Sequence, residues 1–185
     1  MTPAALVDRL ADATIGETFN FYADGSGADV RRTRLERYLA TRADATLLLV
    51  GEAPGFRGAR VSGIPFTSER QLTGVGPAEA TATVVQRVLA VLGIADETLL
   101  WNVVPTHPHE PERPSTNRRP TRVEIEAARR FLRLLVPGRR VVPVGRVAEA
   151  ALGRTGVRHP SHGGAPAFED GLRTILARRA GRKEW

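Results

Sequence analysis

Short apolar runs alternate with helical patterns along the chain. The runs have the length of strands and lie at 46–50, 98–104 and 140–144, where the sequence reads TLLLV, TLLWNVV and RVVPV. Strands that alternate with helices pair in parallel and are covered by helices on both faces. The pattern therefore predicts an α/β fold, a three-layer α/β/α sandwich with a central, mainly parallel four-stranded sheet.

Local signals mark where the helices begin and end. Pro77 stands near the start of one helical pattern, and Gly93 comes just past its end. Thr121 and Glu124 form a capping box, which predicts a helix from there to about Val136. Further helices are expected at about 3–12, 30–42 and 168–180.

Two segments stand outside this pattern. Residues 105–120, PTHPHEPERPSTNRRP, contain five prolines and predict an extended loop, which at this length is usually functional or disordered. His107, His109 and Glu110 could ligate zinc, but their spacing lacks the fixed geometry of a metal motif, so we expect no metal and a phosphate-contacting loop. The chain ends in a basic tail, either a frayed terminus or a DNA contact: Arg178, Arg179, Arg182 and Lys183.

Length and composition narrow the class of protein. The 185 residues fit a single domain over 1–185. No apolar run approaches the ~20 residues that span a bilayer, so we expect a cytoplasmic protein without membrane contact. The absence of cysteine excludes disulfides and thiolate-held metals or clusters. The net charge of +7 favours a polyanion partner. Lys183 is the only lysine among the 27 cationic residues, and this bias towards arginine either suits phosphate binding or reflects genomic base composition.

The stretch LLLVGEAPGF, residues 47–56, combines a buried strand with a turn that contains one carboxylate, Glu52. In open α/β sheets, ligands bind just outside the carboxyl ends of such strands. Glu52 would then face a crevice. The alternative is that the glycines and the proline only form the loop that joins the strand to the next helix.

Four segments that follow or flank the predicted strand ends resemble motifs of the uracil-DNA glycosylase superfamily, closest to its family 4. In the family's order they are GEAPG at 51–55, GIPF at 63–66, WNVV at 101–104 and HPS at 159–161. The segments NRRPTRVEIEAARRFL and VGRVAEAAL are also similar. The resemblance covers residues 46 to about 175. It implies a monomeric enzyme without a cofactor that flips deoxyuridine out of DNA and hydrolyses its N-glycosidic bond to release uracil.

The resemblance also implies roles for the residues that bind the base. Phe66 would stack on uracil. The Asn102 amide would pair with uracil O4 and the N3 hydrogen, and His159 would donate to O2, where negative charge develops as the bond breaks. Gly51 and Gly55 would line the same pocket. Taken singly, these side chains are more typical of a core phenylalanine, a loop-capping asparagine and a surface histidine, and the order of the motifs favours the pocket roles.

The position of the attacking water is less well defined. Some relatives carry an aspartate at the third position of the first motif, where this chain has Ala53. Glu52 is the nearest remaining carboxylate, and it either positions the water or accepts backbone amide hydrogen bonds that hold the turn. The predicted catalytic positions are therefore His159, Glu52 and Ala53.

The chain departs from family 4 in the residues that hold an iron-sulfur cluster. Those enzymes use four cysteines, and this chain has none. Thr106 and Ala128 stand at two of the expected ligand positions. We therefore expect packing and charge to hold the loop 105–120. The acidic residues that usually follow GEAPG are replaced by Phe56, Arg57, Gly58 and Ala59.

A second departure concerns DNA. Many relatives follow HPS with a bulky residue that fills the gap left by the flipped base, whereas His162, Gly163 and Gly164 stand here. Either His162 is the plug, or flipping is less well supported and activity favours single strands and mismatches. The expected DNA-binding residues are Ser161, His162, Gly163, Arg158 and Arg118.

Gly55 replaces the tyrosine that excludes the thymine methyl group in some relatives. Since one methyl group is worth only ~1–3 kcal/mol, the sequence predicts poor discrimination against thymine. Two other functions compete with uracil excision. Ala53 and the weak wedge suggest a module that binds deaminated or abasic DNA without turnover. A small-molecule hydrolase with a phosphate-cradling turn ranks lower, because the turn lacks a P-loop lysine and the chain has no GxGxxG.

Overall fold

The three apolar runs form the strands of one parallel sheet. The structure, a computed structural model, describes residues 1–180. Strand β1 (Leu47–Gly51) lies between β2 (Thr98–Asn102) and β3 (Arg140–Pro143), and both pairings are parallel. Leu48 is in register with Leu99 and Val141. Because all of β1 and β2 is buried, the strands read as continuous apolar runs rather than as alternating ones.

The predicted α/β fold with a mainly parallel sheet is confirmed, but within residues 1–180 the sheet has three strands rather than four. Just after β3, Val144 and Val157 form an isolated parallel bridge. Val157 donates its N–H to Pro143 O and accepts from Gly145 N, both at 2.8 Å. No further pairing follows this bridge within residues 1–180.

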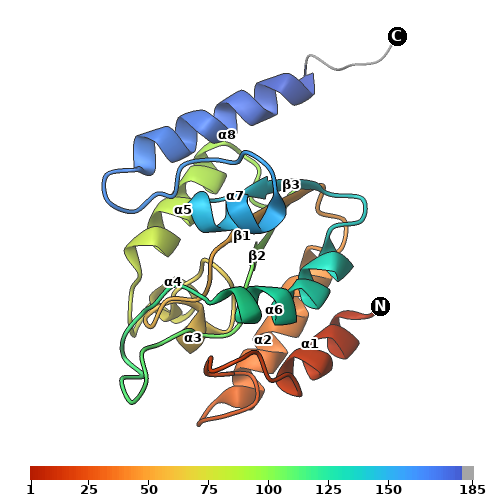
Figure 1. Cartoon of the computed structure of the whole chain (residues 1–185). Helices are drawn as coiled ribbons and strands as arrows, with labels where there is room; N and C mark the ends of the chain where they lie inside the picture. Colours follow the sequence, from red (N-terminus) through yellow and green to blue (C-terminus); the bar gives the residue numbers. More distant parts are fainter. Residues whose placement is uncertain (181–185) are drawn as a thin grey trace.

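Helices cover both faces of the sheet, as Figure 1 shows. One face, which includes Leu48 and Val50, packs on α1 (Pro3–Ala11), α2 (Ala28–Thr41) and α6 (Arg122–Leu135). The other, which includes Leu47 and Leu49, packs on α5 (Ala80–Val91) and α8 (Ala165–Ala180). Alternate residues of β1 thus point into two separate clusters of buried side chains, which gives the three layers.

The five predicted helices correspond to α1, α2, α5, α6 and α8. The capping box of α6 is present, because Glu124 N donates to Thr121 Oγ1 at 3.3 Å and Thr121 N donates to the Glu124 carboxylate at 2.7 Å. Three shorter helices were not predicted, although α4 begins with a capping box of Ser68 and Gln71 and each of the three ends at a glycine: α3 (Ala59–Ser62), α4 (Glu69–Thr73) and α7 (Arg146–Leu152). No helix within residues 1–180 is long and apolar enough to cross a membrane. A DNA contact is one of two interpretations of the basic tail from the sequence. The side chains of this tail lie outside those that the structure describes: Arg178, Arg179, Arg182 and Lys183.

Hydrogen bonds anchor the loop 105–120 to the rest of the protein. His107 exchanges backbone hydrogen bonds with Phe19. Arg118 donates two hydrogen bonds, of 2.8 and 2.6 Å, to the buried carboxylate of Glu124. Burial alone would raise the pKa of Glu124, but hydrogen bonds from Arg118 and Thr121 lower it instead, so the pair is ionic. The loop is therefore held against the first turn of α6.

Candidate active site

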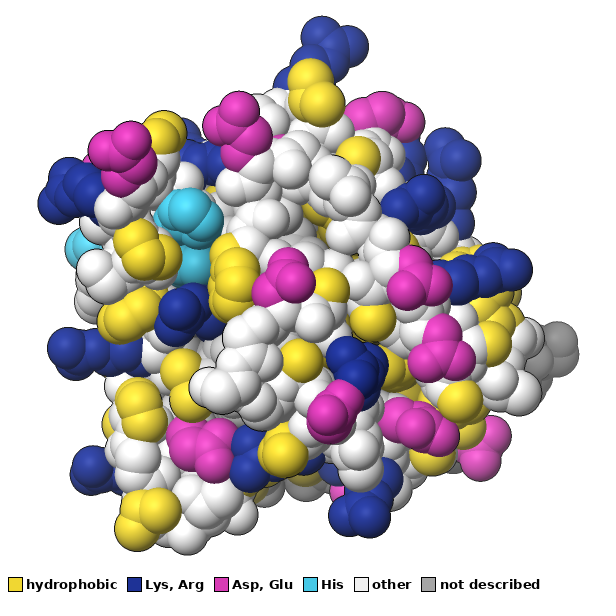
Figure 2. Space-filling view, turned by 90° about the horizontal axis from the view of Figure 1, so that it is seen from below, with side chains coloured by type: hydrophobic (Ala, Val, Ile, Leu, Met, Phe, Trp, Pro, Cys, Tyr) yellow, Lys and Arg dark blue, Asp and Glu magenta, His cyan; other side chains and the backbone are white. Residues whose placement is uncertain are grey.

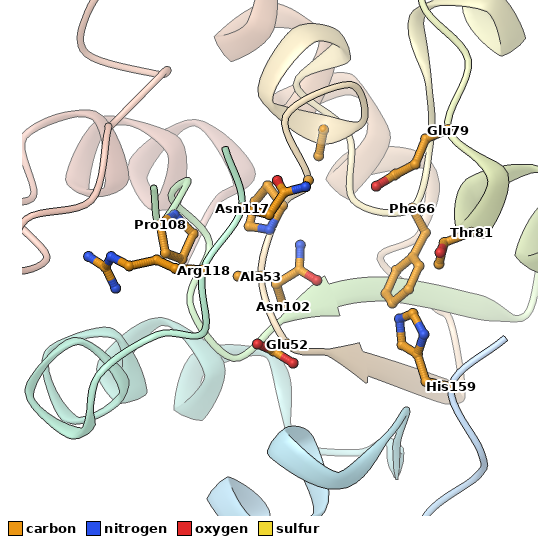
Figure 3. Close-up of a pocket in the computed structure, with 13 residues that line it drawn as sticks. Glu52, Ala53, Phe66, Glu79, Thr81, Asn102, Pro108, Asn117, Arg118 and His159 are labelled. Carbon is orange, nitrogen blue, oxygen red and sulfur yellow. The ribbon is translucent and has the colours of Figure 1, made fainter. Parts of the chain in front are cut away.

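A pocket of about 200 Å³ opens at the carboxyl ends of β1 and β2. Figure 3 shows the side chains that converge on it. Seven residues predicted from the sequence line it: Glu52, Ala53, Gly55, Phe66, Asn102, Arg118 and His159. The tertiary structure thus brings together all four motif segments at the edge of the sheet where parallel strands place their ligands.

Gly51, predicted to line the pocket, is not among its lining residues and instead packs against the Phe66 ring. A Cβ atom added to Gly51 would collide with the Phe66 ring and would lie 2.9 Å from Asn102 Oδ1. Only glycine allows the ring and the amide to approach the strand end so closely. Phe66 has a left-handed backbone, with φ of 51°, which is rare for a bulky residue. Its carbonyl accepts a hydrogen bond from Gln86 Nε2 at 3.1 Å, which helps to hold this conformation.

Asn102 is the last residue of β2 and pairs in register with Gly51. Its side chain is 4% exposed and lines the pocket. Within residues 1–180, no protein group hydrogen-bonds to its side-chain amide. A buried polar group usually has a partner. The amide is thus not a loop cap, and its donor and acceptor are available to a ligand.

His159 lies across the pocket from Glu79, with its ring orientation fixed by Ser161. The Ser161 backbone N–H donates to His159 Nδ1 at 3.2 Å, and the Ser161 hydroxyl is 2.7 Å from the same atom. Because a backbone N–H can only donate, Nδ1 is an acceptor and the proton of the neutral ring is on Nε2. Burial lowers the pKa of His159, and the nearby Arg158 and His162 lower it further. The ring is thus a neutral hydrogen-bond donor near pH 7.

Glu52 is half-buried at the pocket wall. Burial raises the pKa of its carboxyl group, and Arg119 opposes that rise. Within residues 1–180 its carboxylate accepts no hydrogen bond. The turn is braced by others, because His107 Nδ1 donates to Pro54 O at 2.9 Å and Phe56 N donates to Asn117 Oδ1 at 2.8 Å. The carboxylate is thus free for a water, while the adjacent Ala53 adds no polar group.

Three polar pocket residues were not predicted: Glu79, Thr81 and Asn117. Glu79 and Thr81 belong to no motif that the sequence analysis identified and flank the start of α5, whereas Asn117 is the first residue of the similar segment NRRPTRVEIEAARRFL. Glu79 is the more unusual, since its carboxyl group is largely buried and burial raises its pKa. Acidic residues near a helix start are ordinary. No signal in the sequence therefore separates Glu79 from a surface residue.

The predicted DNA-binding residues occupy two places. Ser161, His162 and Gly163 follow His159 directly, and the exposed His162 is 3.0 Å from the Ser161 hydroxyl through Nδ1. Arg158 is exposed beside them. The Arg118 guanidinium, in contrast, is engaged by Glu124. The structure thus gives Arg118 a structural partner that the sequence analysis did not consider.

On the face that Figure 2 shows, positive charge is scattered rather than gathered in one patch. Cationic side chains lie near the centre of this face as well as at its edge, with acidic ones among them. Beside the active-site pocket, an open groove at the first turns of α6 and α7 contains four arginines: Arg119, Arg122, Arg129 and Arg146. Within residues 1–180, only Arg129 of these four forms a salt bridge, with Glu126. In the described part of the chain, this groove thus presents three arginines without a salt bridge: Arg119, Arg122 and Arg146.

The residues at the family's cluster positions do not fit an iron-sulfur cluster. The Thr106 side chain is buried and hydrogen-bonded to Thr18, and Ala128 is buried in the core beneath α6. The chain has no cysteine that could supply a thiolate. Among the described residues, no three His, Cys, Asp or Glu side chains group as metal ligands. His107 is instead buried against Pro54, and its ring stacks on that of His109 at 5.8 Å.

Comparisons with known proteins agree with this geometry. The family model of the uracil DNA glycosylase superfamily matches residues 40–176. The crystal structure of wild-type SMUG2 from Pedobacter heparinus superposes with a TM-score of 0.71 at 16% sequence identity, and the match covers 100% of both chains. That likeness shows a common fold. No curated protein matches the chain in sequence.

Proposed function

The chain belongs to the uracil-DNA glycosylase superfamily, and we propose that it hydrolyses the N-glycosidic bond of deoxyuridine in DNA and releases uracil. One observation supports this proposal above the others. The Asn102 amide is buried at the pocket without a protein partner within residues 1–180, and the rings of Phe66 and His159 line the same pocket. A planar amide with an open donor and acceptor, next to an aromatic face, is complementary to a pyrimidine base.

Binding requires the base to leave the helix. Extrusion of a base costs about a few kcal/mol, and stacking on an aromatic side chain returns ~1–3 kcal/mol. Phe66 supplies that face. The Asn102 amide donates to O4 and accepts from the N3 hydrogen. Cytosine reverses both groups, so the amide distinguishes uracil from it.

Bond cleavage separates charge between the sugar and the base. As the C1′–N1 bond breaks, its electrons move onto uracil and C1′ becomes an oxocarbenium ion. The Nε2 hydrogen of neutral His159 donates to O2 and stabilises the negative charge that develops there. A water on the Glu52 side of the pocket adds its oxygen to C1′ and gives its proton to the Glu52 carboxylate. The departing uracil anion then takes up a proton from solvent and Glu52 releases the one it accepted, so the products are an abasic site and uracil.

DNA contact is proposed for the rim of the pocket. Arg158, Ser161, His162 and Gly163 lie next to His159 in the chain, and His162 is exposed with φ of 51°. We assign the plug to His162 and phosphate contact to Arg158. The unpaired arginines of the neighbouring groove add a second cationic surface for the strand that enters the pocket.

Release of free uracil from a labelled oligonucleotide tests this function. We expect excision from single strands and U·G mismatches. His159→Ala should lower the single-turnover rate constant ~10²–10³-fold, because the lost donor acts mainly in the transition state. Binding to abasic product should be nearly unchanged, and His109→Ala, at a histidine outside the pocket, is the control.

A binder of deaminated or abasic DNA is the second candidate, since Ala53 gives the pocket no aspartate for the attacking water. Tight binding of uracil-containing DNA without release of uracil would favour it over the glycosylase.

A further inference from the structure

The Glu79 carboxyl group fills the part of the pocket that lies over two glycines. A Cβ atom added to Gly55 would collide with Glu79 Oε1, and one added to Gly58 would collide with Oε2. Glu79 lies just before α5, and Figure 3 shows its carboxyl group pointing into the pocket. The lack of side chains at Gly55 and Gly58 therefore leaves a space that Glu79 occupies from a distant part of the chain.

Helix stability does not explain this position of Glu79. The residue is the N-cap of α5, but its side chain makes no capping hydrogen bond. The backbone carbonyl alone accepts, from Thr83 N and Thr83 Oγ1, both at 3.0 Å. Within residues 1–180 the carboxyl group has neither a hydrogen bond nor an ion pair. A largely buried carboxyl group without a partner costs free energy, which indicates a role in the pocket rather than in the fold.

The orientation of the base, which rests on the proposed function, identifies what Glu79 faces. Asn102 and His159 use the O4, N3 and O2 atoms of uracil, so the C5–C6 edge is left for the remaining walls. C2 and C5 lie opposite each other in a pyrimidine ring. In Figure 3, His159 and Glu79 lie on opposite sides of the Phe66 ring. With His159 at O2, Glu79 is next to C5.

We propose that Glu79 determines specificity by closing the pocket, through the volume of its side chain, against substituents at C5 of the base. Thymine differs from uracil by one methyl group at C5. With Gly55 alone this wall would be open, and the sequence accordingly predicts poor discrimination against thymine. With the Glu79 carboxyl group over Gly55, the methyl group meets the two carboxyl oxygens instead of open space. Thymine is therefore rejected by a residue outside the sequence motifs.

Single-turnover excision of uracil and thymine, each opposite guanine in the same duplex, tests this role. The measured quantity is the ratio of the thymine rate constant to the uracil rate constant. Glu79→Ala should raise this ratio at least about tenfold, since one methyl group in a pocket is worth about 10–200-fold. Glu79→Gln keeps the volume and should keep the wild-type ratio. Glu79→Ser provides a second truncation with a good N-cap residue, and exposed Glu36→Ala on α2 is the matched control.

The outcomes separate this inference from the proposed function. A wild-type protein that releases no uracil would overturn the proposed function, and this inference with it. If uracil is released but the Glu79→Ala and Glu79→Ser ratios equal that of the wild type, only the role of Glu79 is overturned. An equal rise in Glu79→Gln and Glu79→Ala would also overturn it, because the volume of the side chain would then not be what excludes the methyl group.

Discussion

The Ser161 backbone N–H donates to Nδ1 of His159 and thereby sets which ring nitrogen carries the proton. Protonation of Nδ1 would place two donors against each other, so the active form is the neutral ring. Because Ser161 contributes this bond through its backbone, Ser161→Ala keeps it. A change of the His159 side chain, in contrast, removes the donor to the base.

The rate of uracil excision should depend on pH through His159. Burial lowers its pKa below the usual histidine value, so the neutral form persists to lower pH. The single-turnover rate constant should be constant from pH 8 to about the ordinary histidine pKa of ~6.5 and fall only as the pH drops through the lowered pKa. A loss of rate already between pH 8 and 7 would contradict the neutral-donor assignment.

Protonation of Glu52 should cause a second loss of the uracil excision rate at acidic pH. Burial raises its pKa above the usual glutamate value, and the carboxylate that accepts the water proton is lost as the pH falls through this raised pKa. Glu52→Gln should lower the rate constant at neutral pH and leave only the His159 dependence in the pH profile. If the pH profile and the rate constant of Glu52→Gln both equal those of the wild type, Glu52 does not take part in the reaction.

Asn102→Asp should change the base preference of the enzyme rather than damage it uniformly. The carboxylate loses the donor to O4 and faces a carbonyl, at a cost of ~1–3 kcal/mol for each buried group left unpaired. It can instead accept from the N4 amino group of cytosine, so slight cytosine excision should appear while uracil excision drops steeply. Retained uracil excision, or a loss of thermal stability in proportion to the loss of activity, would make Asn102 a structural residue.

Gly51→Ala should lower both activity and stability, because its Cβ atom collides with Phe66 and crowds Asn102. Overpacking of this kind typically costs ~1–3 kcal/mol in the free energy of unfolding. Urea denaturation would measure this cost. The double variant Gly51→Ala, Phe66→Leu should recover part of the stability but not the activity, since the ring that stacks on the base is gone.

Replacement of Arg158 by alanine should weaken DNA binding, whereas replacement of Arg118 by alanine should lower stability. Arg158 is exposed near His159, so Arg158→Ala should flatten the dependence of log K on log salt by about 0.9 for one lost phosphate contact. Arg118→Ala leaves the buried Glu124 carboxylate without its partner and should instead cost ~3–5 kcal/mol of stability. Salt titration of DNA binding and denaturant unfolding of both variants distinguish these effects. A flattened slope without loss of stability in Arg118→Ala would show that this arginine contacts phosphate.

Local sequence patterns, which involve residues close together in the chain, determined the positions of the strands, the start of α6 and three of the pocket residues. Apolar runs predict the strands, because a strand buried on both faces must be apolar throughout. The capping box of Thr121 and Glu124 predicts the start of α6, since both groups satisfy backbone atoms within one turn. The four motif segments predict Phe66, Asn102 and His159 as pocket residues through resemblance, and parallel strand ends explain why they meet.

Contacts between distant segments were decided only by tertiary structure. Glu79 lies over Gly55 because α3 and the start of α5 pack at the same edge of the sheet, and no local pattern encodes that approach. Glu124 both caps α6 and binds Arg118, although the sequence indicates only the first role. Val157 pairs with Val144 in a single bridge rather than in a fourth strand, a difference that no local pattern predicted. Periodicity and capping are short-range, whereas the steric fit and charge pairing that shape the pocket exist only once the layers have packed.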